Sequence, residues 1–197
     1  MTRKIVLVSH PERPDAIETA RVVTEHLAVM GIDTVISHSP QATAGAELIL
    51  VIGGDGTILR AAEFGRPAGI PILGINYGHV GFLSEADPDE VPMVMKKIES
   101  GAWQIVPRMT IDITVTRPDG TVERSWALNE ASVEKEEHAR MIEASIGVDN
   151  RELSSFKVDT VLFSTATGST AYNFSAGGPV VWPNVECMVL TPIAAHA

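Results

Sequence analysis

The strongest chemical signal in the chain is a glycine-rich turn with the sequence Gly-Gly-Asp-Gly-Thr at residues 53–57. It directly follows the apolar residues 48–52, which predict a buried strand that ends in a turn with almost no side chains. Backbone N–H groups in such a turn are open to the phosphates of a ligand, and a helix beginning at Thr57 points its positive end at the same place. We therefore expect Gly53, Gly54 and Thr57 to form a phosphate loop.

Asp55 is the unexpected member of this turn, because a carboxylate beside bound phosphate is electrostatically unfavourable unless it has a task. It could hold a metal ion, accept a proton from a substrate hydroxyl, or hydrogen-bond a ribose. A kinase-like active site accounts for this carboxylate better than a simple binding loop does. An ordinary tight turn stays open as an alternative, since the segment matches neither G-x-G-x-x-G nor a P-loop.

Asn129 and Glu130 form a second polar cluster, in an otherwise apolar stretch that we expect to be one strand over residues 122–134. Side chains at neighbouring strand positions point to opposite faces, so at most one of the two can face a core without penalty. The pair therefore indicates recognition of a hydroxyl or a metal ion. An exposed pair on the outer face of the strand is the alternative.

Two further segments are rich in groups that suit a polar ligand. Residues 164–170 carry five hydroxyl side chains and one glycine, which predicts a turn of hydrogen-bond donors or a helix start that caps itself. The loop at residues 74–83 combines glycines with aromatic side chains. Its aromatics could stack on a base, and a simple packed loop is an equally good interpretation.

Composition limits the classes of partner. The chain has 197 residues, 45% of them hydrophobic and 20% charged, which suffices for one large or two small cores and is unlike a disordered chain. A net charge of −10 argues against binding to nucleic acids or to anionic membranes. Small phosphorylated ligands must then be held by backbone amides, a few local cations and a divalent metal ion.

The single cysteine, Cys187, cannot form an internal disulfide, and no apolar stretch reaches the length of a membrane helix. We therefore expect a cytoplasmic protein. The six histidines show no metal-ligand spacing, so we expect no metal site built from histidine or cysteine.

Apolar spacing in the first half of the chain predicts strands and helices in alternation. The strands are expected at residues 5–8, 33–36, 48–52 and 70–75, and the helices at 15–30, 57–64 and 87–98. Capping boxes are expected at Asp15-x-x-Glu18 and Asp87-x-x-Glu90. The alternation predicts an α/β domain at residues 1–100 with a parallel sheet, which binds ligands at the carboxyl ends of its strands.

From residue 101 the apolar period changes from helical to two. This pattern predicts antiparallel strands at residues 109–115, 122–134 and 142–148, followed by an apolar strand at 161–163. We therefore expect residues 101–197 to form a β-rich domain of the α+β class.

Taken together, these clusters resemble the NAD kinase family of bacterial type, and the resemblance covers almost the whole chain. The glycine turn alone is shared with diacylglycerol and sphingoid kinases, whereas the combination of motifs in this order is far more specific. The motifs lie at residues 53–57, 78–83, 129–130, 165–172 and 175–179. The resemblance implies an enzyme that phosphorylates the adenosine-ribose 2′-hydroxyl of NAD with ATP to give NADP.

The resemblance also implies roles for single residues. Asp55 would lie beside the accepting hydroxyl as its base or orienting group, and Gly56 would line the phosphate region. The remaining residues that the family implies for NAD binding are Phe82, Asn129, Glu130, Lys157, Asp159, Thr170, Ala171, Tyr172 and Ser175. Family members use ATP with a divalent metal ion, here expected to be Mg²⁺, and form homo-oligomers (dimers or tetramers).

The chain departs from the family pattern at Ala166, where a proline is usual, and at Thr160, where a glycine is usual. We expect both changes to loosen their turns without abolishing them. Family members also continue through several more strands, so the second domain is expected to be incomplete at residue 197. A lipid kinase that shares the glycine turn, or a non-catalytic NAD-binding fragment, stays open as an alternative function.

Overall fold

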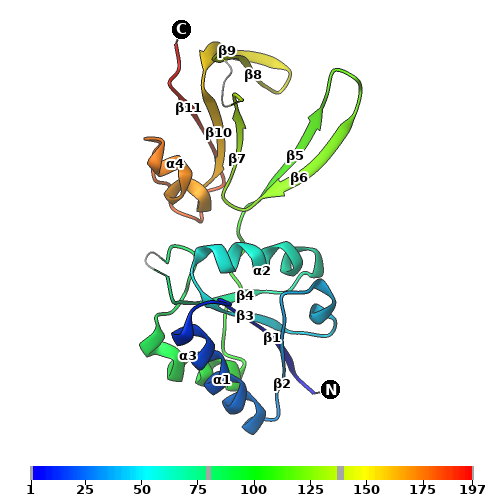
Figure 1. Ribbon diagram of the computed structural model, residues 1–197, viewed down its shortest axis with the longest axis vertical. Coiled ribbons are helices and arrows are strands. Elements are labelled where there is room, and N and C mark those ends of the chain that lie inside the picture. Colours follow the sequence, from blue (N-terminus) through cyan, green and yellow to red (C-terminus); the bar gives the residue numbers. More distant parts are fainter. Residues whose placement is uncertain (1, 79–80, 137–139, 197) are drawn as a thin grey trace. The chain divides into compact units, whose positions relative to one another are not determined.

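The computed structural model describes residues 2–78, 81–136 and 140–196. The chain divides into two compact units, Met1–Val106 and Pro107–Ala197, which are described separately (Figure 1). Three residues of interest lie outside the described residues. They are His79 and Val80, which belong to the motif at residues 78–83, and His138, one of the six histidines. Within the described ranges, no helix has the length and apolar character needed to cross a membrane.

The first unit is a four-stranded parallel sheet with helices on both faces (Figure 1). Its strands stand in the order β2-β1-β3-β4. They are β1 (Lys4–Ser9), β2 (Asp33–Ile36), β3 (Leu48–Gly53) and β4 (Ile72–Asn76), and the helices are α1 (Pro14–Val29), α2 (Asp55–Ala68) and α3 (Val91–Ser100), with short 3₁₀ turns η1 (Pro40–Thr43) and η2 (Pro88–Glu90). The predicted α/β architecture is confirmed.

Alternating side chains of the central strands build two cores. Ile5 and Leu7 of β1 face α1 and α3, whereas Val6 and Val8 face α2. All four side chains are fully buried, and burial of each such side chain stabilises the folded state by about 1.5–3 kcal/mol. The carboxyl ends of β1, β3 and β4 are therefore held in fixed positions, and the loops that follow them start from a rigid edge.

Helix starts differ in part from the sequence-based expectation. The helix α2 begins at Asp55, two residues before Thr57, because Gly54 is its N-cap and accepts hydrogen bonds from the N–H groups of Thr57 and Ile58. The capping box expected at Asp15 does not form, since Pro14 occupies the first helical position and Arg13 is the N-cap. The capping box expected at residues 87–90 is confirmed, with the Glu90 carboxylate accepting the Asp87 N–H at 2.9 Å.

The second unit is built almost entirely from antiparallel strands, which confirms the β-rich prediction. Its three-stranded sheet has the order β11-β10-β7, and two hairpins, β5-β6 and β8-β9, accompany it. The strands are β5 (Ile111–Thr116), β6 (Val122–Ala127), β7 (Glu130–Glu134), β8 (Ile142–Val148), β9 (Arg151–Val158), β10 (Thr160–Thr165) and β11 (Met188–Ile193), and the 3₁₀ turn η3 (Thr167–Thr170) and the short helix α4 (Tyr172–Ser175) follow β10.

Two features of this unit correct the expectation from sequence. The single strand expected at residues 122–134 is broken into β6 and β7. The break occurs because Thr165 bonds to both carbonyls at that point: its N–H donates to Asn129 and its hydroxyl donates to Leu128, at 2.8 and 2.6 Å. The strand β9 was not predicted, although Asp149 and Asn150, both with positive φ, make the tight turn that leads into it.

Residues 101–106 belong with the first unit, beyond the boundary expected at residue 100. Trp103 packs against the core shared by α1 and α3, and the Arg3 guanidinium lies 5.7 Å from the centre of its ring. The Arg3 side chain also donates to the carbonyls of Ile98 and Glu99 at the end of α3. These contacts tie the segment after α3 to the N-terminal strand.

Ala166 already has the backbone shape of the proline that the family pattern prefers. Its φ of −58° lies close to the value that proline imposes, and among the described residues no backbone hydrogen bond uses its N–H. The preceding residue, Thr165, lies in strand β10, and residues before proline favour extended backbone. Thr160, the other departure, is a regular strand residue and has no positive φ that would call for glycine.

We expect Ala166→Pro to raise the free energy of unfolding by about 0.4–1 kcal/mol, because it restricts the unfolded chain without straining the folded one. Urea denaturation of the purified chain measures this change. Ala176→Pro is the matched control: Ala176 has a φ of −80°, but its N–H donates to Tyr172 at 2.9 Å, so this variant should be destabilised. Equal destabilisation of both variants would contradict the account of the turn.

Candidate functional site

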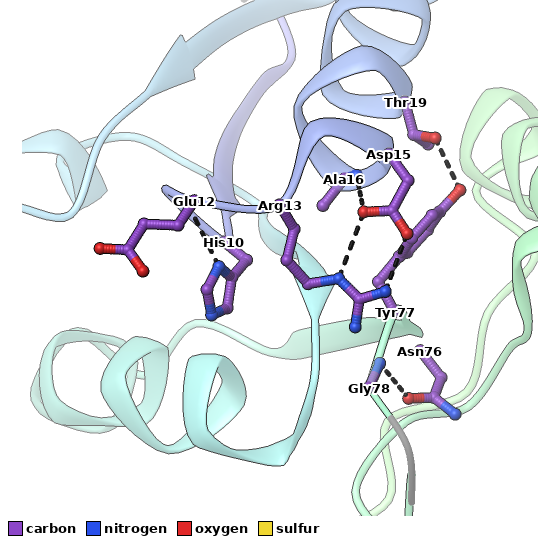
Figure 2. Close-up of polar contacts among 9 residues, drawn as sticks. All are labelled: His10, Glu12, Arg13, Asp15, Ala16, Thr19, Asn76, Tyr77 and Gly78. Carbon is purple, nitrogen blue, oxygen red and sulfur yellow. Dashed lines mark hydrogen bonds and ion pairs between the residues drawn. The ribbon is translucent and has the colours of Figure 1, made fainter.

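A cavity of about 400 Å³ opens at the carboxyl edge of the parallel sheet in the first unit. Residues from the loops after β1, β3 and β4 and from the start of α2 line it. Figure 2 shows the wall that includes the loop after β1 and the residues that follow β4. The lining residues that matter most for the chemistry of the cavity are His10, Arg13, Gly54, Gly56, Thr57 and Arg60. The cavity lies where the strand order predicts a ligand site.

The glycines of the predicted phosphate loop have different tasks. Gly54 and Gly56 line the cavity, and a Cβ at Gly56 would meet nothing within 4 Å, so the space beside it is open to a ligand. Gly53 is buried, and a Cβ there would collide with the Thr57 side chain, which folds back over it. Gly53 thus allows the strand and the helix to pack, while Gly56 leaves room for a phosphate at the positive end of α2.

Asp55 holds the segment at residues 81–83 against the start of α2. Its half-buried carboxylate accepts the Leu83 N–H at 3.1 Å and the Phe82 N–H at 3.3 Å. Asp55 is not among the residues that line the cavity. An ionised carboxylate offers about four acceptor sites, so two of them stay available for a substrate hydroxyl, a water or a metal ion.

The cationic side chains of the cavity were missed by sequence reasoning. Arg60 lies four residues after Gly56, which places it on the same face of α2, and Arg13 and His10 lie in the loop after β1. A search for basic residues at the carboxyl ends of the predicted strands would have found them. Tyr77, which also lines the cavity, is fixed by a hydrogen bond between its hydroxyl and Thr19, at 2.6 Å (Figure 2).

In the second unit, hydroxyl side chains hold the turn at residues 164–170 together. The Thr165 hydroxyl donates to the Leu128 carbonyl and accepts the Gly168 N–H at 2.9 Å. The Ser169 hydroxyl donates to the Ala166 carbonyl at 2.7 Å and accepts the Val181 N–H at 2.9 Å. These two hydroxyls are therefore used within the turn and its neighbouring backbone, and they are not free donors for a ligand.

Gly168 allows this turn to pack closely against the Asn129 backbone, just before the start of β7. A Cβ at this position would collide with the Asn129 backbone, so only glycine permits the approach. Asn129 and Glu130 are consequently held beside the turn that contains Thr167, with Glu130 paired to Ser164 across the sheet. Asn129 itself lies in the break between strands, and the argument from opposite strand faces therefore does not apply to it.

Three buried oxygens of this region have no hydrogen-bond partner among the described residues: Asn129 Oδ1, Glu130 Oε2 and Thr167 Oγ1. Burial raises the pKa of the Glu130 carboxyl above its ordinary value. An unpartnered buried polar group costs about 1–3 kcal/mol, and the contact between Gly168 and the Asn129 backbone brings the residues that carry these three oxygens into one region of the second unit. Asn129 and Glu130 were predicted as binding residues; Thr167 was not.

The other predicted NAD-binding residues of the second unit differ in exposure. Asp159 forms an ion pair with Lys135 at 2.8 Å, and Lys157 is exposed and shares two backbone hydrogen bonds with His196. The remaining four lie at the end of the turn and just after it: Thr170 and Ala171 are partly buried, and Tyr172 and Ser175 are exposed. In the first unit, the predicted Phe82 is 59% exposed.

Two family models match the chain, one in each unit. The model of the ATP-NAD kinase N-terminal domain matches residues 7–103, and that of the ATP-NAD kinase C-terminal domain matches residues 128–197. The chain is 42% identical to NAD kinase 2 of Streptomyces coelicolor over 99% of its own length and 71% of that protein. It is also 42% identical to the NAD kinase of Corynebacterium diphtheriae, over 99% of its length and 68% of that protein.

The chain belongs to the NAD kinase family. Two solved structures agree with the chain in fold. An NAD kinase from Archaeoglobus fulgidus, solved in complex with ATP, matches 98% of this chain and 73% of its own, with a TM-score of 0.79 and 31% identity. Yeast NADH kinase, solved with NADH, matches all of this chain and 67% of its own, with a TM-score of 0.86 and 24% identity, and supports the fold alone.

We expect Glu130→Gln to gain stability relative to the wild type as the pH rises. A buried carboxyl with a raised pKa contributes stability below its unfolded pKa and loses that contribution as the pH rises through its folded pKa. The uncharged glutamine does not suffer this loss. Free energies of unfolding from urea titrations at about pH 4 and pH 7 measure the difference.

Glu134→Gln is the matched control, because Glu134 lies on the same strand and is exposed. It should change stability little at either pH. If Glu130→Gln fell further below the wild type at pH 7 than at pH 4, the Glu130 carboxylate would have a stabilising partner and the account of an unpartnered oxygen would be wrong.

Proposed function

We propose that this chain transfers the γ-phosphoryl group of ATP to the adenosine-ribose 2′-hydroxyl of NAD, which gives ADP and NADP. Membership of the NAD kinase family supports this reaction. The observation that carries the proposal is the group of buried, unpartnered oxygens on Asn129, Glu130 and Thr167, because a polyhydroxylated ligand supplies the donors that they lack.

The donor half of the reaction uses the cavity of the first unit. The phosphates of ATP would bind the N–H groups at the start of α2, where Gly56 leaves space and the helix end is positive. The relative from Archaeoglobus fulgidus was solved with ATP, which supports ATP as the donor. Arginine side chains and backbone amides are the groups that an acidic chain must use for this purpose.

The acceptor half uses the second unit. Ribose hydroxyls of NAD would donate to Asn129 Oδ1 and Glu130 Oε2, and the hydroxyl of Thr167 would complete the polar contacts. The family pattern assigns the rest of the dinucleotide to a wider set of residues, which stay predictions: Phe82, Lys157, Asp159, Thr170, Ala171, Tyr172 and Ser175.

Phosphoryl transfer depends on positioning and charge stabilisation more than on covalent chemistry from the protein. The 2′-oxygen forms a bond to the γ-phosphorus, the bond from that phosphorus to the ADP oxygen breaks, and the hydroxyl proton passes to a base. Asp55 is our candidate for that base. Its carboxylate is oriented by the N–H groups of Phe82 and Leu83 and has acceptor sites to spare.

A divalent ion, most simply Mg²⁺, would accompany the nucleotide. The described residues contain no group of three or more His, Cys, Asp or Glu side chains that could cage a metal ion. Mg²⁺ usually binds through one or two carboxylates and the phosphates of its substrate, so the proposed ion needs no such cage. The ion would neutralise phosphate charge.

We also propose that the protein acts in the cytoplasm as a homo-oligomer. The lone cysteine suits a reducing compartment. Large apolar side chains near the end of the described chain are exposed, which suits burial against another copy: Phe174, Val180, Trp182, Val185 and Met188.

The reaction is tested by incubating the chain with Mg-ATP and NAD and measuring NADP formation. We expect turnover by the wild type, and a loss of about 10²–10⁴-fold in turnover for Asp55→Asn, the usual contribution of a general base. NAD affinity and the thermal unfolding midpoint, measured beside it, should change little if the loss is chemical.

Asp87→Asn is the control for removing a carboxylate at a helix start of the same unit, and it should keep the wild-type rate. An unchanged rate for Asp55→Asn would remove this residue from the chemistry. Phosphorylation of a lipid alcohol in place of NAD, or NAD binding without turnover, would overturn the proposed function; family membership favours neither outcome.

A further inference from the structure

Arg13 reaches the cavity in a fixed orientation. Its Nε–H donates to Asp15 Oδ1 at 3.2 Å and its Nη2 donates to Asp15 Oδ2 at 2.9 Å (Figure 2). The carboxylate therefore binds one edge of the guanidinium through two hydrogen bonds. Arginine has five N–H donors. The three that remain have no partner within the described part of the chain, and Arg13 lines the cavity.

The backbone around Arg13 is also fixed. The residue lies between Pro11 and Pro14, and its φ of −100° and ψ of 111° are those of a residue that precedes proline. Arg13 is the N-cap of α1, but its side chain makes no capping hydrogen bond. Backbone and side chain are thus both ordered before any ligand arrives, which lowers the entropic cost of binding.

Stability does not explain the ion pair between Arg13 and Asp15. The two side chains are 37% and 50% exposed, and exposed ion pairs contribute little to folding. Asp15 also accepts the Ala16 N–H at 2.9 Å, so the helix start holds the carboxylate itself in place. The start of α1 thus holds Asp15, and Asp15 holds the guanidinium of Arg13, a residue of the cavity lining.

The other polar groups of the cavity favour an anion. Arg60 has no hydrogen-bond partner in the described ranges, and the N-terminus of α2 faces the same space. His10 accepts the Glu12 N–H at Nδ1, and its Nε2 lies on the side of the ring away from Glu12 (Figure 2). Among the described residues that line the cavity, Glu12 is the one carboxylate against two arginines, in a chain of net charge −10.

We propose that Arg13 binds the polyphosphate chain of the phosphoryl donor and that Asp15 is a positioning residue that orients it. The inference rests on the proposed function for the identity of the donor. A planar guanidinium with one edge held by a carboxylate presents its other donors in the geometry that phosphate oxygens accept. Arg60 supplies a second cation across the same cavity.

The test measures binding of inorganic tripolyphosphate to the full chain by calorimetry. We expect Arg13→Ala to weaken binding about 10-fold or more, since a hydrogen bond between charged groups is lost. Arg13→Lys should be intermediate, because it keeps the charge without the planar fork. Asp15→Asn keeps Oδ1 for the Ala16 N–H and loses the charged pair, so it should weaken binding less than Arg13→Ala does.

The matched control is Glu18→Gln, which breaks an ion pair of the same helix between Glu18 and Arg21. Glu18 does not line the cavity, so tripolyphosphate affinity should not change. In steady-state kinetics, the KM for ATP should rise in both Arg13→Ala and Asp15→Asn while the KM for NAD stays the same. A purely structural role of the pair would alter both constants together.

The outcomes separate this inference from the proposed function. If the wild type forms NADP and Arg13→Ala binds tripolyphosphate as tightly as the wild type, the inference is wrong and the function stands. If Arg13→Ala loses affinity but Asp15→Asn does not, the positioning role of Asp15 is wrong. If tripolyphosphate binding depends on Arg13 and no NADP forms, the phosphate site stands and the proposed reaction does not.

Discussion

Buried oxygens without partners are the constraint on which the site in the second unit depends. The turn at residues 165–168 is fixed by hydrogen bonds from Thr165 to the backbone of residues 128 and 129, and Gly168 permits the contact. That contact leaves the side chains of Asn129, Glu130 and Thr167 buried with oxygens that nothing in the described chain satisfies. The folded chain carries this cost, and a ligand with hydroxyl donors would remove it.

The first unit has a different requirement: it must bind negatively charged phosphates although the protein itself is acidic. Its buried central strands, β1 and β3, fix the edge from which the loops emerge, and the glycine turn clears side chains from the start of α2. Cations then complete the cavity from neighbouring elements, with Arg13 in the loop after β1 and Arg60 on α2. Rigid elements thus supply the geometry, while a few side chains supply the charge.

Sequence reasoning predicted the parts that depend on local pattern. Apolar spacing and turn residues predicted the parallel sheet and the β-rich unit. It missed what depends on contacts between distant segments. Nothing local shows that Thr165 would break the strand at residue 129, that its hydroxyl would be used internally, or that Asp55 would bind the N–H groups of Phe82 and Leu83. The cavity arginines were missed because single cations carry no periodic signal.

The most direct test of the central claim is a binding cycle between the oxygens of the second unit and the hydroxyls of NAD. Affinities of the wild type and of Asn129→Ala are measured for NAD and for analogues that each lack one ribose hydroxyl. Our account predicts that removing the hydroxyl bound by Asn129 weakens wild-type binding about 10-fold, and weakens binding to Asn129→Ala far less. If every analogue lost the same affinity for both proteins, the unpartnered oxygen of Asn129 would not be a ribose site and the account would be contradicted.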